Sequence, residues 1–272
     1  QNTIGMQVTG DAFMKKLIII GLIAAILTLC FFSSCCQKEA LTISVTRLSP
    51  TYQDWLLKAD STLIIKNLYG ISPDSALSVL MRSDGLLITG GEDIFPALYG
   101  REPDTIHSDG YDPYRDYLEL ACLSKSFEAG IPVFGICRGF QIINVHQGGS
   151  LIVDLPTELG TDVAHRCPDP MKCLHPVKTE PKSHLRHITG LNEGMVNSNH
   201  HQGIDRLAST LTGVCFSADQ LIEGIEWKEK SGKSFLMAVQ WHPERLIENP
   251  GFSEPLALEF IKEAKNFQAK KP

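Results

Sequence analysis

One stretch of the sequence decides the fold: Ile131-Pro132-Val133-Phe134-Gly135-Ile136-Cys137-Arg138-Gly139. A short apolar run enters a turn flanked by glycines, and an amphipathic stretch at 140–145 follows, so the pattern predicts a strand, a sharp turn and a helix. Cys137 then lies at the edge of a sheet, above the first turn of the helix, in the geometry called a nucleophile elbow. A helix N-terminus favours the thiolate, which is the reactive form of cysteine. Cys137 is therefore the candidate nucleophile.

A second motif supplies a candidate base. The apolar run 235–239 is followed by Gln240-Trp241-His242-Pro243-Glu244. His242 can take the proton of a thiol, and Glu244, two residues further, lies on the same side of an extended segment. There its carboxylate can bond the second imidazole nitrogen and fix the tautomer, which completes a nucleophile–base–orienter set. A buried structural cysteine and a solvated histidine are the ordinary alternatives, but the two motifs together favour catalysis.

Together these motifs resemble the class I glutamine amidotransferase fold and, within it, the gamma-glutamyl-gamma-aminobutyrate hydrolase branch (peptidase family C26). The resemblance spans about residues 41–267. The Asn-His-His-Gln stretch and the arginine after Cys137 favour this branch over ordinary amidotransferase subunits. Further matching stretches are Thr89-Gly90-Gly91-Glu92-Asp93, Tyr111-Asp112-Pro113 with Arg115-Asp116 and Glu119, and Asn197-Ser198-Asn199-His200-His201-Gln202-Gly203.

The resemblance implies hydrolysis of a gamma-glutamyl amide or isopeptide through a thioester on Cys137. The oxyanion needs fixed donors, and the backbone amides of Arg138 and of Gly91 in the Gly90-Gly91 pair are the candidates. A plain strand-to-loop turn is the alternative for the glycine pair. His242 would protonate the leaving amine and later activate water. The partner implied is a small gamma-glutamyl compound, and no metal, nucleotide or redox cofactor is required.

The substrate-binding candidates are weaker. Gln141 is similar to a family position near the glutamyl end of the substrate, although it can equally be a capping or surface residue. In the stretch Asn199-His200-His201, adjacent histidines point opposite ways in extended backbone, so at most one faces the substrate, and a structural or solvated role is the alternative for each. Glu92 and Asp93 can bind the substrate's amino group or cap a helix.

Four residues superficially resemble a zinc site: His165, Cys167, Cys173 and His175. Their spacing is not the usual C-x₂₋₄-C, and prolines stiffen the loop between them, so no metal site is assigned. A Cys167–Cys173 disulfide is favoured over zinc because the expected compartment is oxidising. Free thiols are the default for both residues.

Alternating strands and helices predict an α/β fold with a doubly wound, mostly parallel sheet, and a smaller β-rich portion added in the C-terminal half. Loops at the carboxyl ends of the parallel strands then carry the site. Strands are expected at 41–46, 62–65, 85–89 and 131–136, helices at 52–59, 73–82, 113–129 and 255–268, and short strands at 176–179, 195–197, 214–217, 222–227 and 234–240, with a hairpin turn at Gly232.

Composition fits a single catalytic domain at 41–268, because the chain has 272 residues, of which 43% are hydrophobic. The net charge of −6 and the absence of a basic cluster in the body argue against a nucleic-acid partner.

The beginning of the chain predicts export. Lys15-Lys16 precede an apolar run at 17–29, which is shorter than the roughly 20 residues of a spanning helix. Small residues before Cys35 resemble a bacterial lipoprotein processing site, so 14–35 is expected to be a signal, Cys35 the lipidated residue, 36–40 a tether and 1–13 an upstream segment. Cys30 and Cys36 are alternative processing sites, and an uncleaved membrane anchor is the alternative to a signal. Both interpretations place the domain outside the cytosol, in the periplasm or on the cell surface.

Export changes the expected substrates, because relatives of this branch act mostly in the cytosol. Gamma-glutamyl peptides scavenged outside the cell, or the gamma-D-glutamyl bond of cell-wall fragments, are the candidate substrates. Two rivals remain: a glutaminase subunit that supplies ammonia to a synthetase, and a non-catalytic lipoprotein that binds gamma-glutamyl compounds. The sequence carries no signal for an oligomeric state.

Overall fold

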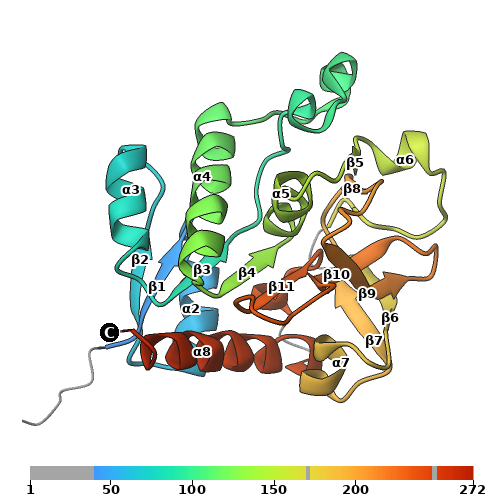
Figure 1. Ribbon diagram of the computed structural model, residues 1–272. Helices are drawn as coiled ribbons and strands as arrows, with labels where there is room; N and C mark the ends of the chain where they lie inside the picture. Colours follow the sequence, from blue (N-terminus) through green and yellow to red (C-terminus); the bar gives the residue numbers. More distant parts are fainter. Residues whose placement is uncertain (1–39, 170–171, 247–249, 272) are drawn as a thin grey trace, which may run out of the picture. The chain divides into compact units, whose positions relative to one another are not determined.

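The computed structural model describes residues 40–169, 172–246 and 250–271. Within them, one mixed sheet has nine strands in the order β2-β1-β3-β4-β11-β10-β9-β6-β7 (Figure 1). The upstream segment, the expected signal with Cys35, and all of the tether except Ala40 lie outside the described residues. No helix in the described ranges has both the length and the hydropathy needed to cross a bilayer.

Five strands form the parallel half of the sheet. They are β2 (Ile64–Asn67), β1 (Thr42–Val45), β3 (Gly85–Ile88), β4 (Val133–Ile136) and β11 (Leu236–Val239), and each pairs in parallel with the next. Every residue of β3, β4 and β11 is buried. Parallel strands that are buried along their whole length require a layer of helices on each face of the sheet.

Two helical layers supply this cover. On one face, α2 (Pro50–Ala59) packs against α8 (Glu254–Gln268); on the other, α4 (Pro113–Ala129) packs against both α3 (Pro73–Leu80) and α5 (Arg138–His146) (Figure 1). The expected helices are therefore present, with ends shifted by one or a few residues.

The two faces have separate apolar cores, because successive side chains of a strand point to opposite sides. In β4, Phe134 joins the core formed with α2 and α8, where Phe260 lies 5.8 Å from it between ring centroids. Its neighbour Val133 joins the core formed with Leu118 of α4 and Phe140 of α5. The nucleophile strand is therefore fixed from both sides.

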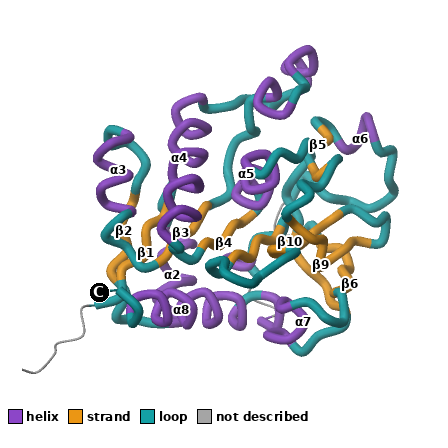
Figure 2. Tube along the Cα trace, in the orientation of Figure 1, coloured by secondary structure: helices purple, strands orange, loops and turns teal. Residues whose placement is uncertain are grey.

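The C-terminal strands continue the same sheet in antiparallel fashion. The chain turns at Gly232 between β10 and β11, which are antiparallel, as the sequence predicted. The β-rich portion predicted for the C-terminal half is present, and it belongs to the same sheet because β10 pairs with β11. Figure 2 shows its strands β10, β9 and β6 in orange. The remaining elements of this half are β10 (Ile222–Trp227), β9 (Leu211–Ser217), β6 (Leu174–Thr179), β7 (Glu193–Asn197), α6 (Leu155–Glu158), α7 (His184–Thr189) and the small pair β5 (Leu151–Ile152) with β8 (Gly203–Ile204).

Several short elements were not predicted. The connection from β3 to α4 contains two 3₁₀ helices, η1 (Pro96–Tyr99) and η2 (Glu102–His107), and two more, η3 (Pro243–Arg245) and η4 (Pro250–Phe252), follow β11. Helix α4 starts after Asp112, whose side chain accepts a bond from the Arg115 N–H. Because β3, β4 and β11 are parallel neighbours, the segments after their carboxyl ends meet at one edge of the sheet.

Candidate active site

Cys137 lies between the end of β4 and the start of α5. Its backbone has φ 51° and ψ −100°, a conformation that is uncommon for a residue with a side chain and that characterises strained functional turns. The turn requires glycine on both sides: a Cβ on Gly135 would lie 2.6 Å from Ile143 Cδ1, and one on Gly139 would lie 2.2 Å from the Ile88 carbonyl oxygen. The structure thus shows the predicted strand–turn–helix arrangement around the thiol.

His242 and Glu244 form a hydrogen-bonded pair beside Cys137. His242 Nδ1 lies 2.8 Å from Glu244 Oε1, and Nε2 has no hydrogen-bond partner among the described residues. A Cβ on Gly90 would lie 2.9 Å from His242 Cε1 and 3.5 Å from Cys137 Cβ, so thiol and imidazole flank the same glycine. The local geometry differs from the expected extended segment, because η3 turns the chain and brings Glu244 back to the ring.

The charges around His242 favour its protonated form. Burial alone lowers the pKa of His242, but the negative charges of Cys137 and Glu244 outweigh burial and raise that pKa above its usual value. An imidazolium beside the thiol is the state that holds a cysteine as its thiolate.

The backbone of His242 is held by Asn197, a residue that the sequence interpretation did not assign to the site. The His242 N–H donates to Asn197 Oδ1 at 2.9 Å, and Asn197 Nδ2 donates to the His242 carbonyl at 2.9 Å. The feature of the sequence that could have identified Asn197 as a site residue is its position at the start of the Asn-Ser-Asn-His-His-Gln stretch. These two hydrogen bonds connect the segment of His242 to the end of β7.

A row of side-chain amides reaches the thiol. Gln240 Nε2 donates to Cys137 Sγ at 3.5 Å, and Gln240 Oε1 accepts from Gln141 Nε2 at 3.2 Å. Gln141 also donates to the Gln202 carbonyl at 3.2 Å, and its side chain is buried. The capping and surface alternatives for Gln141 are therefore wrong. Gln240 is the first residue of the Gln-Trp-His-Pro-Glu motif. It is a further residue of the site, to which the sequence alone assigned no role.

The Gly90-Gly91 loop is fixed by two side chains. The Gly90 N–H donates to Tyr52 Oη at 2.9 Å, whereas Gly91 lies in the wall of the pocket that contains Cys137. Arg115 Nη2 donates to the carbonyls of Thr89 and Gly90, at 3.0 and 2.9 Å. A Cβ on Gly91 would lie 1.8 Å from Arg115 Nη1, so the loop is more than a plain turn.

The backbone N–H of Arg138 lies at the start of a helix, a position from which it can donate to an oxyanion. Arg138 is the first residue of α5, and the first N–H groups of a helix have no intrahelical partner. Its side chain points elsewhere, into a buried ion cluster: Arg138 Nη2 lies 2.6 Å from Asp116 Oδ1, and Nη1 binds Glu119. Glu119 also binds Arg115 Nε at 2.9 Å. The cluster therefore joins the elbow to the Gly90-Gly91 loop.

The thiol opens into a pocket of about 190 Å³. This is smaller than the ~300–1,000 Å³ of pockets for drug-sized ligands, so the pocket suits a group of amino-acid size. Its lining residues are Gly91, Glu92, Asp93, Asp109, Gly110, Cys137, Gln141, Arg166, Asn199, His200, His201 and Gln202.

The charged candidates of this pocket are already paired. Glu92 binds Arg115 at 2.9 Å and also Arg47, and Asp93 lies 3.1 Å from His201 Nε2. Neither carboxylate caps a helix, since η1, the next element, begins after Phe95 and has no side-chain cap. Both remain at the pocket as substrate-binding predictions.

The two adjacent histidines have different surroundings. His201 is oriented toward Asp93 and Asp154, at 3.1 and 3.2 Å, and lies at the pocket. The side chain of His200 is buried, with Nε2 3.6 Å from Glu223 Oε1. Asn199, between β7 and these histidines, is half-buried at the pocket.

Cys167 and Cys173 are joined by a disulfide. The default of free thiols is therefore wrong for this pair, and neither sulfur is a zinc ligand. Cys122 and Cys215 are free and buried.

A cysteine elbow on a central parallel strand, with a His–Glu pair after the neighbouring strand, defines a class I glutamine amidotransferase-like protein. The chain belongs to the Peptidase C26 family, which matches residues 29–244. Membership in this family supports hydrolase activity.

Similarity to individual proteins supports the assignment to this family. “Putative glutamine amidotransferase-like protein YvdE” of Lactococcus lactis is 37% identical over 203 residues, which cover 74% of this chain and 78% of the relative. “Gamma-glutamyl-gamma-aminobutyrate hydrolase PuuD” of Escherichia coli is 31% identical over 182 residues, which cover 63% of this chain and 68% of the relative. The solved glutaminase domain of Trypanosoma brucei CTPS with bound acivicin has the same fold, with 16% identity, a TM-score of 0.56 and coverage of 83% and 94% of the two chains.

Proposed function

We propose that this protein hydrolyses gamma-glutamyl amide or isopeptide bonds through a gamma-glutamyl thioester on Cys137. The observation that carries the proposal is the Cys137 elbow next to the His242–Glu244 pair, with His242 Nδ1 bonded to Glu244 at 2.8 Å and Nε2 without a hydrogen-bond partner in the described ranges. This is the nucleophile–base–orienter order of covalent catalysis.

The chemistry follows from these positions. The Cys137 thiolate attacks the gamma-carbonyl carbon, and the carbonyl oxygen takes the negative charge beside the amides of Gly91 and Arg138. The imidazolium of His242 donates its Nε2 proton to the leaving amine, and the C–N bond breaks to leave a thioester. His242 then removes a proton from water, which attacks the thioester and releases the gamma-carboxylate with the free thiol.

The charges of the pocket suit a glutamyl group. The pocket wall carries charges of both signs, because Glu92, Asp93 and Asp109 line it together with Arg166, which pairs with Asp109. A substrate that carries both an ammonium and a carboxylate group can exchange with such pairs. An alpha-amino acid end carries both charges. We propose that this end of the substrate occupies the 190 Å³ pocket, with its gamma-carbon toward Cys137.

A second, larger pocket adjoins the first. It has a volume of about 620 Å³ and shares Asp109, Arg166, His200 and His201 with the pocket of Cys137. We propose that it receives the amine side of the substrate. Its size favours gamma-glutamyl peptides or cell-wall fragments over the small amines that the name of the Escherichia coli relative indicates.

The experiment that tests this function traps the acyl group. In His242→Asn, a gamma-glutamyl p-nitrophenyl ester should acylate Cys137, because p-nitrophenolate leaves as an anion without a proton donor, while hydrolysis of the thioester stalls. The expected result is a burst of about one equivalent of p-nitrophenolate and a protein mass raised by one gamma-glutamyl group. The wild type should then release amines from gamma-glutamyl-aminobutyrate, gamma-glutamyl peptides and muropeptides, with higher kcat/KM for the larger substrates.

The rival functions give different results in the same assays. An ammonia-supplying subunit would hydrolyse glutamine only when a partner synthetase is present. A non-catalytic binding lipoprotein would show neither burst nor adduct, and would leave gamma-glutamyl compounds intact.

We further propose that the protein is an exported lipoprotein anchored through Cys35. The basic, apolar and small-residue segments before Cys35 support this, as does the Cys167–Cys173 disulfide of the domain, since disulfides persist in oxidising compartments. Cys35→Ser should abolish incorporation of a labelled fatty acid, measured on the immunoprecipitated protein, whereas Cys30→Ser and Cys36→Ser should keep it. Label that survives Cys35→Ser would refute this site.

A further inference from the structure

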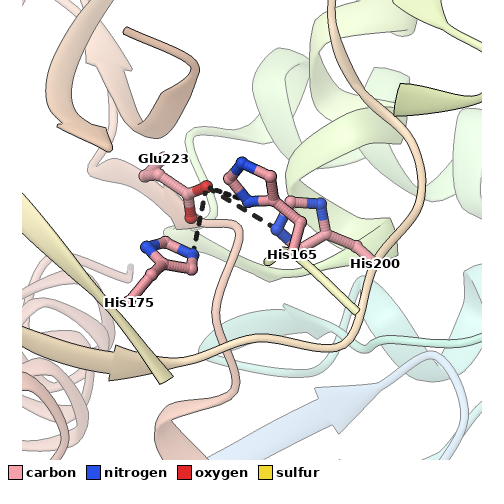
Figure 3. Close-up of side chains that lie close together, drawn as sticks. All are labelled: His165, His175, His200 and Glu223. Atoms are coloured by element: carbon pink, nitrogen blue, oxygen red, sulfur yellow. Dashed lines mark ion pairs between the residues drawn. The ribbon is translucent and has the colours of Figure 1, made fainter. Parts of the chain in front are cut away.

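A buried cluster of three imidazoles and one carboxylate lies apart from the proposed catalytic residues. His165 precedes β6, His175 lies in β6, His200 follows β7, and Glu223 lies in β10. Figure 3 shows the three rings arranged around the Glu223 carboxylate. Glu223 Oε1 lies 3.4 Å from His165 Nδ1, and 3.6 Å from Nε2 of both His175 and His200.

The outward nitrogens of the three rings already have acceptors. His200 Nδ1 lies 2.8 Å from the Gln202 carbonyl, His175 Nδ1 lies 3.3 Å from the Pro176 carbonyl, and His165 Nε2 lies 3.0 Å from Asp219 Oδ2. Carbonyl and carboxylate oxygens accept, so each outward nitrogen carries the ring proton. The inward nitrogens then present lone pairs to the centre of the cluster. The same outer hydrogen bonds fix the orientation of histidines that bind metals.

The inward atoms have no other partner. His165 Nδ1, His175 Nε2, His200 Nε2 and both oxygens of Glu223 are buried and make no hydrogen bond among the described residues. Five buried acceptors around one point are costly, because each loses its bonds to water. A water molecule has two hydrogens and would leave most of them unsatisfied. A cation satisfies them together.

The distances fit one small metal ion. Zinc binds imidazole nitrogen and carboxylate oxygen at about 2.0–2.2 Å, which places tetrahedral ligand atoms about 3.3–3.6 Å apart. The carboxylate-to-imidazole distances of 3.4, 3.6 and 3.6 Å agree with such edges. All four ligand atoms lie within 4.8 Å of one another, so any wider edge would shorten toward about 3.6 Å when the ion binds. Three neutral imidazoles and one carboxylate are a donor set that suits zinc.

We propose that His165, His175, His200 and Glu223 bind one zinc ion in a closed structural site. Four protein ligands complete a tetrahedral shell, so the ion has no open position for a substrate or a reacting water, although His165 and His200 also lie in the wall of the 620 Å³ pocket. This proposal departs from the sequence-based expectation of no metal, for which the local spacing directed attention to Cys167 and Cys173. The fold replaces these sulfurs with His200 and Glu223, and the sulfurs form a disulfide instead.

The zinc would position the rim of the proposed active site. The ion would join the loop of His200 to β6 and β10. The Gln202 carbonyl accepts hydrogen bonds from both His200 and Gln141. Gln141 in turn bonds Gln240, which donates to the Cys137 sulfur. The metal therefore acts on the site through the placement of this loop, and its presence can be measured without any assay of hydrolysis.

The test measures metal in the full chain, purified without a polyhistidine tag and dialysed against metal-free buffer. Mass spectrometry of the metals should find about one zinc per chain. Removal by a chelator should lower the melting temperature by about 5–10 °C, and added zinc, but not magnesium, should restore it.

A matched pair of neighbouring histidines separates this site from surface binding. His200→Asn should lose at least about 90% of the bound zinc, because structural sites need the whole ligand set. His201→Asn, which changes the adjacent residue outside the cluster, should keep the zinc. If His200→Asn fails to fold, Glu223→Gln removes one charge at nearly unchanged volume and should show the same loss.

Three results would overturn the proposal. One is wild-type protein that holds less than about a tenth of an equivalent of zinc and does not change its melting temperature on adding it. Another is equal zinc content in the wild type and in both His200→Asn and Glu223→Gln. The third is a different metal at this stoichiometry, which would refute the assignment of zinc.

Discussion

Replacing Cys137 by alanine is expected to lower kcat/KM for gamma-glutamyl substrates by a factor on the order of 10⁴ or more, because the nucleophile of a covalent mechanism has no substitute. The fold should persist, since only the sulfur atom is removed from a residue already held between β4 and α5. Amine release at substrate concentrations well below KM, with circular dichroism on the same samples, measures both effects.

Cys122 provides the matched control. It is a buried free cysteine of α4, and burial raises the pKa of its thiol to about 12, so it stays protonated and unreactive at neutral pH. Cys122→Ala should keep its turnover, and iodoacetamide should alkylate Cys137 but not Cys122 in the wild type. Unchanged turnover in a folded Cys137→Ala variant would refute the proposed mechanism.

Glu119→Ala is expected to destabilise the domain by about 3–5 kcal/mol, because breaking a buried ion pair leaves uncompensated charge. Glu119 is fully buried and binds both Arg115 and Arg138, so its loss affects two guanidinium groups. The urea concentration at the midpoint of unfolding should fall. The m-value, which reports the surface exposed on unfolding, should change little. Activity should fall too, because Arg115 holds the Gly90-Gly91 loop.

Glu128→Ala is the control for this variant. Glu128 belongs to the same helix, α4, and pairs with Lys125 at 2.7 Å, but both side chains are exposed. Exposed pairs contribute about 0–1 kcal/mol, so this variant should unfold nearly as the wild type does. Equal destabilisation by the two substitutions would show that the buried cluster has no special role.

The parts predicted well from sequence are those with local signals. The run before Cys137 and the run before His242 are short, apolar and closed by glycine or proline, and both became buried parallel strands. Their adjacency was not predicted, because the sequence grouped 234–240 with the short strands of the β-rich portion, whereas β11 pairs in parallel with β4.

The site residues that could not be predicted from the sequence are those that depend on contacts between distant segments. Tyr52 lies in α2, where no neighbouring residue signals that its hydroxyl will accept a hydrogen bond from the Gly90 N–H. Asn197 is the last residue of β7 and Gln240 directly follows β11, and polar residues at strand ends can have many roles until their partners are known. The ligand cluster shows the same limit, because sequence proximity grouped His165 and His175 with cysteines, whereas Glu223 arrives from another strand.

The place of β11 in the sheet has a consequence for when the thiol becomes reactive. This strand is inserted between β4 and β10, although it follows β10 in the chain and precedes only α8 among the longer elements. Chains are synthesised from the N-terminus, and pairings between distant segments form late. A growing chain therefore carries Cys137 before His242 has been added, so on the proposed mechanism we expect the thiol to become reactive only when β11 completes the sheet.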